Sequence, residues 1–180
     1  MKKRIIVCFM LVALLCATGC GLPGCMNQPD QDRERVLQRM AEVTMAINAR
    51  DKAALKAVFS KKAETDALEA GASIDKQIDE FFDLIRGEIT ESQYSSSVVY
   101  DSFGKERKKT IKSAFSVIFD EQSCAFNLLD CPINADSNEV GLYTLRVTRA
   151  EDWENQRSER EITIPGVYYK PGYVPEAIVE

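Results

Sequence analysis

Residues 110–120, TIKSAFSVIFD, decide the fold, because apolar and polar side chains alternate through them. Successive side chains of a strand point to opposite faces of a sheet. One face of this segment would carry Ile111, Phe115, Val117 and Phe119, while polar side chains occupy the other. The stretch therefore predicts a half-buried strand that covers an apolar core on one side.

Four other segments of the second half are strand candidates. They are residues 98–100, 124–129, 141–149 and 161–169. Pro165 interrupts the last of them, and proline in a sheet is confined to edges and bulges. We expect an antiparallel meander in which 161–169 lies at an edge or carries a bulge.

The half of the chain before Gly87 has helical periodicity instead. Two segments repeat apolar residues at i, i+4, i+7 and i+11, the spacing of one helix face: Val36, Met40, Val43 and Ile47, then Ile74, Ile78, Phe81 and Ile85. Asp51 and Ser60 are placed to cap shorter helices between them. Helices followed by strands predict an α+β fold, with the N-terminal helices packed on a strongly curved antiparallel sheet.

The net charge of the chain bears on whether it binds nucleic acid. The chain has 23 Lys and Arg against 28 Asp and Glu, a net charge of −5. Without Lys2, Lys3 and Arg4 the balance is 20 against 28, or −8. An acidic domain repels phosphate backbones, so we expect no nucleic-acid partner.

The chain contains no histidine. Histidine is the commonest general base and the usual ligand of catalytic zinc. Serine or cysteine hydrolase triads of the usual kind are thereby excluded, and the sequence points to no catalytic residue, metal or cofactor. The basic cluster Lys105, Arg107, Lys108 and Lys109 is interpreted as a solvated turn and strand start.

The first twenty residues, MKKRIIVCFMLVALLCATGC, have the organisation of a bacterial lipoprotein export signal. Three basic residues precede an apolar run at 5–16, which is too short to span a bilayer as a mature helix. Small residues at 17–19 then precede Cys20. Signals of this kind are removed before the cysteine, whose sulfur carries the lipid. Cys25, preceded by Gly24, is the alternative lipidation site.

This signal predicts three regions. Residues 1–19 are the signal peptide, 20–32 a flexible tether rich in glycine and proline, and 33–180 a single domain. Two acyl chains hold a protein at a membrane. We expect the protein at the outer face of the cytoplasmic membrane, or at the outer membrane if the source has two membranes.

Cys124 and Cys131 lie inside the predicted domain. An exported compartment permits a disulfide, and closing a loop of about eight residues would contribute roughly 2.5 kcal/mol. A straight strand would instead separate the two cysteines by more than about 20 Å, whereas bridged Cα atoms lie about 5.5 Å apart. A disulfide and two reduced thiols therefore remain alternatives.

Several aromatic residues are candidates for a pocket or a contact surface. If the sheet bends into a cone, some of them would line its mouth and hold a ligand. The candidates are Phe82, Tyr100, Phe115, Tyr143 and Trp153. Packing in the core is the alternative interpretation for each of them.

Four segments resemble the bacterial lipoproteins of the family called domain of unknown function 5104: INARDKAALKAVFS (47–60), IDKQIDEFFDLIRGEI (74–89), VGLYTLRV (140–147) and PGVYY (165–169). The resemblance implies a cone-shaped fold of the nuclear transport factor two and cystatin-like superfamily. There a long helix closes one side of a strongly bent sheet. The superfamily includes SnoaL-like enzymes and binding domains, so the fold alone does not choose a function.

The leading hypothesis is a non-catalytic module that binds a small ligand or an envelope protein and contacts the membrane through its anchor. A SnoaL-like enzyme that uses Asp, Glu or Tyr as acid–base groups is the first alternative. A structural envelope protein with a filled core is the second.

Overall fold

The computed structural model describes residues 28–84, 87–102, 107–119, 121–149 and 165–168. The chain divides into two units, Met1–Gln31 and Asp32–Glu180, and all the described residues except 28–31 belong to the second. The helices of the described part are α2 (Gln28–Asn48), α3 (Lys52–Ala57), α4 (Lys61–Glu69) and α5 (Ile74–Leu84). The strands are β1 (Ile89–Ser102), β2 (Lys108–Phe119), β3 (Gln122–Asn134), β4 (Gly141–Arg149) and β5 (Gly166–Tyr168), with the 3-10 turn η1 (Ser137–Glu139) between β3 and β4.

The helices form where the apolar periodicity predicts them. The expected stripe of α2, from Val36 to Ile47, is buried throughout. The two predicted caps are confirmed, because the Asp51 carboxylate accepts from the Ala54 amide and the Ser60 hydroxyl accepts from the Ala63 amide. Each cap satisfies an amide that lacks a partner within its own helix.

The strands form one sheet in the order β1-β2-β3-β4-β5. The pairs from β1 to β4 are antiparallel, as predicted, but β5 pairs with β4 in parallel. The prediction of a purely antiparallel sheet is therefore wrong. A parallel pair needs a crossover connection, and residues 150–164 lie between these two strands. The sheet is not strongly curled, so the protein is α+β with a mixed sheet and the predicted cone is not confirmed.

Two strands are longer than predicted. β1 has 14 residues, although only 98–100 form an apolar run, and β3 extends on both sides of 124–129. The polar residues 91–97 form strand because they pair with the apolar β2, which supplies their hydrogen-bond partners. Local composition is a weak guide to such edge strands.

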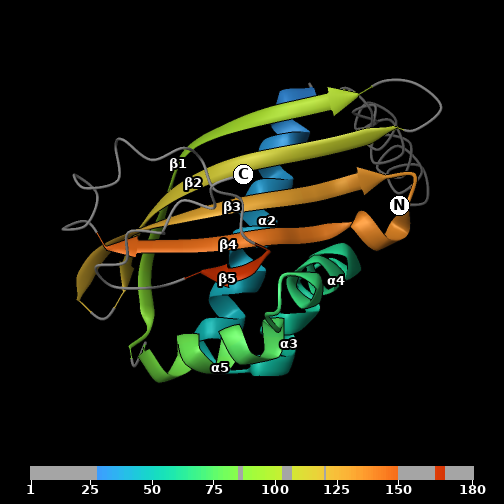
Figure 1. Cartoon of the computed structure of the whole chain (residues 1–180). Helices are drawn as coiled ribbons and strands as arrows, with labels where there is room; N and C mark the ends of the chain where they lie inside the picture. The colour runs from blue at the N-terminus through green and yellow to red at the C-terminus, as the bar shows by residue number, and fades with distance from the viewer. Residues whose placement is uncertain (1–27, 85–86, 103–106, 120, 150–164, 169–180) are drawn as a thin grey trace, which may run out of the picture. The chain divides into compact units, whose positions relative to one another are not determined.

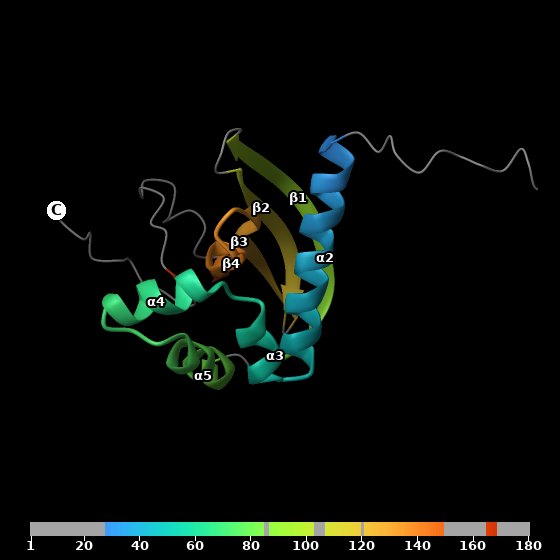
Figure 2. The same ribbon diagram turned by 90° about the vertical axis from the view of Figure 1, so that its right-hand side faces the viewer.

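The helices pack on the sheet in two groups. Helix α2 runs along one face of the sheet, whereas α3, α4 and α5 gather beside β4 and β5 (Figure 1). The same separation is visible from the side (Figure 2). Between them lies one core, whose largest side chains include Phe81, Phe82, Phe126 and Leu145. In the described part of the chain, no helix is both long and apolar enough to cross a membrane.

The start of β4 is joined to the segment between α3 and α4. The Leu142 amide donates to the Val58 carbonyl at 2.8 Å, and the Ser60 amide donates to the Leu142 carbonyl at 2.9 Å. Gly141 lies against this junction with φ +129°, and a Cβ there would stand 2.9 Å from the Ser60 nitrogen. The junction thus depends on a residue without a side chain.

Replacing Gly141 with alanine is expected to lower the free energy of unfolding by about 3 kcal/mol, because it adds backbone strain and a steric clash. Gly71→Ala is the matched control. Gly71 also has positive φ, at +74°, but nothing lies within 4 Å of its would-be Cβ. It should cost only about 1 kcal/mol. Denaturant unfolding followed by circular dichroism measures both, and equal losses would contradict the close approach at Gly141.

Candidate functional site

A buried ion pair joins α2 to the sheet. Lys109 of β2 is 1% exposed, and its Nζ contacts both carboxylate oxygens of Asp32, at 2.8 and 2.9 Å. Asp101 of β1 also approaches this ammonium, with its Oδ2 at 3.5 Å. Arg35 lies one turn further along α2, 3.8 Å from Asp32. One lysine therefore links a helix and two neighbouring strands.

Strand alternation explains why Lys109 points inward. It shares the inner face of β2 with Ile111, Ser113 and Phe115, all of which are buried. Lys108 points to the opposite face and reaches Glu139 instead. The interpretation of Lys109 as part of a solvated cluster is therefore wrong. The same period of two that predicted β2 would have placed this lysine in the core.

A second ion pair lies beside the first. Arg39 of α2 donates through Nε to Asp130 Oδ1 of β3 at 3.1 Å and through a terminal nitrogen to Glu42 at 2.7 Å. Burial raises the pKa of Asp130, while the charge of Arg39 and its hydrogen bond oppose that shift. The guanidinium thereby offsets part of the cost of burying this carboxylate.

The ion pairs Lys109–Asp32 and Arg39–Asp130, together called the lock below, hold α2 on the sheet. Breaking a buried pair by removing one partner costs about 3–5 kcal/mol, although the intact pair adds little net stability. Their effect is to fix the position of α2 over β1, β2 and β3. Each buried carboxylate is held by a cation, which leaves it poorly suited to proton transfer. Among the described residues no group of three or more cysteine and acidic side chains could hold a metal ion.

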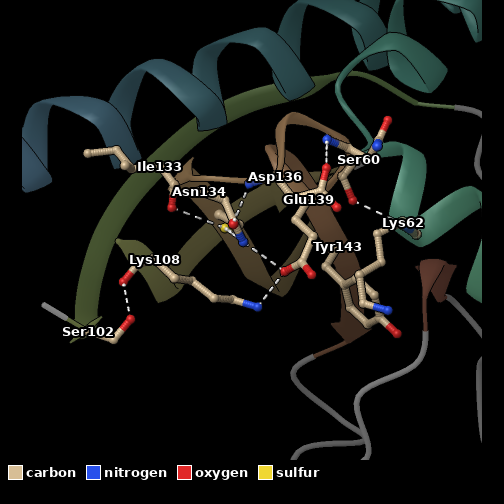
Figure 3. Close-up of polar contacts among 12 residues, drawn as sticks. Ser60, Lys62, Ser102, Lys108, Ile133, Asn134, Asp136, Glu139 and Tyr143 are labelled. Carbon is tan, nitrogen blue, oxygen red and sulfur yellow. Dashed lines mark hydrogen bonds and ion pairs between the residues drawn. The ribbon is translucent and has the colours of Figure 1, made fainter. Parts of the chain in front are cut away.

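A second, more exposed cluster orders the connection between β3 and β4 (Figure 3). Glu139 Oε2 accepts hydrogen bonds from Lys108 Nζ at 2.5 Å and from Asn134 Nδ2 at 2.8 Å. Asn134 Oδ1 in turn accepts from the Asp136 amide. These hydrogen bonds fix the conformation of the turn, because its polar groups bond to one another.

Tyr143 of β4 and Asp66 of α4 connect the sheet to this helix. The Tyr143 hydroxyl donates to Asp66 Oδ2 at 2.7 Å, and Lys62 approaches the same oxygen at 3.0 Å. Burial, then the hydrogen bond to Asp66, raises the pKa of Tyr143 to about 12. The hydrogen bond from Tyr143 and the contact with Lys62 lower the pKa of Asp66. At neutral pH the pair is thus a protonated donor and an ionised acceptor.

The four candidate aromatic residues that the structure describes do not gather at one place. Phe82 and Phe115 lie in the core, each 2% exposed, and Tyr143 is half-buried against α4. Tyr100 is 53% exposed on β1, where the Lys112 ammonium lies 5.6 Å from its ring centre. Trp153 lies outside the described residues.

Cys124 and Cys131 are both buried, and no disulfide joins them. They lie on one continuous strand, β3, where they pair with Arg149 and Gly141 of β4 respectively. An extended strand holds them too far apart to bridge, so the disulfide alternative is not realised. Burial raises the pKa of the Cys131 thiol, which lowers its reactivity. The lipidation candidates Cys20 and Cys25 lie outside the described residues.

Local sequence patterns do not identify the residues of the two buried ion pairs. The tether predicted at 20–32 includes Asp32, yet Asp32 is buried, and α2 begins at Gln28. Arg39 and Asp130 were not singled out at all. An acidic residue near the start of a helix is usually interpreted as a helix cap or as a solvated charge. Only its distant partner on β2 gives Asp32 its role, and this pairing leaves no local signal.

Lys109→Met is expected to destabilise the protein by about 3–5 kcal/mol, because it leaves the buried Asp32 carboxylate without its cation. Lys108→Met is the matched control from the next position. Its side chain is 46% exposed, so its pair with Glu139 should contribute less than about 1 kcal/mol. Chemical unfolding of the two variants separates these outcomes, and a similar loss in both would show that Lys109 is not locked in the core.

Comparison with known protein families matches residues 42–150 to the domain of unknown function DUF5104. No curated protein and no solved structure matches the chain. The matched region runs from the middle of α2 to the end of β4 and covers more than half of the sequence. It includes three of the four segments on which the resemblance rested. The chain belongs to the DUF5104 family.

Proposed function

We propose that the protein is a lipid-anchored module outside the cytoplasm that binds a partner and catalyses no reaction. The anchor is assigned to Cys20, with Cys25 as the alternative, from the signal-like first twenty residues. The location is the outer face of the cytoplasmic membrane, or the outer membrane in a source that has two. The cystatin-like cone belongs to this proposal too, supported by the long α2 along one face of the strands.

One observation supports partner binding above the others. Three consecutive large apolar residues of β1 are exposed to solvent: Val98 by 54%, Val99 by 39% and Tyr100 by 53%. Single exposed apolar residues are common on protein surfaces, but neighbouring ones, here Val98 and Tyr100 on one face of an edge strand and Val99 on the other, are typical of contact sites. We therefore place the contact surface at this end of β1.

The enzyme alternative has one observation in its favour. Asp130 is a buried carboxyl group with a raised pKa. Burial often shifts the pKa of catalytic acid–base residues in this way. Its carboxylate is, however, already bonded to Arg39. We assign it to holding α2 rather than to a reaction. The structural alternative, an envelope protein without a partner, is consistent with the apolar core of the described residues. It gives no reason for the exposed β1 residues.

The anchor is tested by expressing the Cys20→Ala variant in the protein's own host. Lipid labelling and membrane association should both be lost, because the sulfur that receives the acyl chains is gone. Cys25→Ala is the matched control and should keep both. Retained labelling in Cys20→Ala together with its loss in Cys25→Ala would move the anchor to Cys25, and a wild-type protein without any lipid label would contradict lipid anchorage.

Binding is tested by native mass spectrometry of the lipidated protein, which is chemically cross-linked in the host membrane and then released in detergent. The expected spectrum contains the lipidated chain with a bound partner, either a small molecule or a protein chain. The Val98→Lys variant should lose a partner that is bound at β1. The Leu68→Lys variant should retain it, because Leu68 lies on α4 and is even more exposed than Val98. A wild-type spectrum that contains only the empty monomer contradicts the binding module.

A further inference from the structure

The free edge of β1 is regular only at one end. β1 is the first strand in the sheet order, so its outer edge pairs with no described strand. Its register with β2 shifts between Ile89 and Glu91 and again between Tyr94 and Ser96, then runs unbroken from Ser96 to Ser102. Bulges, prolines and lysines are the usual protections of an edge. Residues 96–102 contain none of them, and their one inward-pointing charge, Asp101, is in contact with Lys109.

The side chains of this segment alternate between two faces. Val98 and Tyr100 lie on the outer face, opposite Lys112 and Thr110 of β2. Ser97, Val99 and Asp101 lie on the inner face with α2, where Ser97 contacts the Tyr94 hydroxyl at 2.8 Å. An approaching strand would therefore meet an apolar row on the outside and a mixed row on the inside.

The segment SSVVYDS is complementary to itself when it is read in the opposite direction. With Val99 opposite the same residue of another copy, Val98 faces Tyr100, Ser97 faces Asp101 and Ser96 faces Ser102. A cross-strand pair of an aromatic and a β-branched residue contributes about 0.2–1 kcal/mol, and so does a pair of hydroxyl residues. The only charged residue, Asp101, meets a hydroxyl rather than a like charge.

Neighbouring registers fit less well. Side-chain alternation permits only shifts that keep inner and outer faces together. One such shift places Asp101 opposite Val99, and the other pairs Asp101 with Ser95, inside the irregular part of β1. The register centred on Val99 alone uses the whole regular segment of both copies.

We propose that the partner of this surface is a second copy of the chain, and that the two β1 edges pair antiparallel about a two-fold axis at Val99. The two sheets then form one continuous sheet. This inference rests on the proposed function, because it names the partner of the contact surface assigned above. The contact is isologous, so it closes at two copies and leaves no free β1 edge to extend an assembly.

Membrane anchorage explains how so small a contact can operate. A pairing of seven residues buries less than the roughly 1,200–2,000 Å² of a stable interface, so the dimer is weak in dilute solution. Two copies tethered to one membrane meet at a much higher effective concentration. Asp32 is linked through Lys109 to Asp101, two residues from the axis. The two domains therefore begin close together, as anchors in the same membrane require.

The test uses the mature, lipidated protein in its native membrane, in a Cys25→Ser background that keeps its lipid label. Val99→Cys places a thiol opposite its own copy, where Cβ atoms lie about 4.5–5.5 Å apart. A mild oxidant should convert it to a disulfide-linked dimer at least ten-fold faster than Met45→Cys. Met45 is 65% exposed on α2 and reports random collisions.

The register is tested by expressing Val98→Cys and Tyr100→Cys together with different tags. These positions face each other in the proposed dimer, so the mixed pair should cross-link faster than either variant alone. Circular dichroism confirms that each variant remains folded, which is expected because the replaced side chains are exposed.

Cross-linking of Val99→Cys no faster than that of Met45→Cys overturns the dimer. If native mass spectrometry then still finds a bound partner that Val98→Lys removes, only the identity of the partner was wrong. If it finds the empty monomer, the proposed function fails as well. Faster cross-linking of Val99→Cys without preference for the mixed pair overturns the register and with it the self-complementary pairing.

Discussion

The contact between Lys109 and Asp32 is the constraint on which the rest of the structure depends. It joins α2 to β2 and, through Asp101, to β1. The neighbouring pair of Arg39 and Asp130 extends the connection to β3. Apolar packing supplies most of the stability of such a domain, but it is non-directional. The charged contacts select one position of α2 among several that would bury the same apolar stripe.

The lock also organises the surface that we assign to binding. Asp101 is held from the inside by Lys109, and Lys112 lies over Tyr100 on the outside. The segment between Ser96 and Ser102 is thereby supported from both faces while its outer edge stays available. Exposed apolar residues on a mobile strand would favour aggregation. Held in a single register, they favour one defined contact.

The sequence predicts those parts of the fold that rest on local chemistry. Apolar residues at periods of 3.6 and 2 residues predicted α2, α5, β2 and β4. The capping residues Asp51 and Ser60 were also identified from the sequence. The parallel pairing of β5 and the length of β1 were not foreseen, because each depends on a strand elsewhere in the sequence. The ion pairs were missed for the same reason, since Lys109 lies 77 residues from Asp32.

The most direct test of the lock is the coupling free energy between Asp32 and Lys109. It is obtained from the unfolding free energies of wild type, Asp32→Asn, Lys109→Met and the double variant. We predict a coupling of more than about 2 kcal/mol, because the second replacement removes a group that the first has already left unpaired. Losses that add within about 0.5 kcal/mol would mean that the two residues do not hold α2 on the sheet.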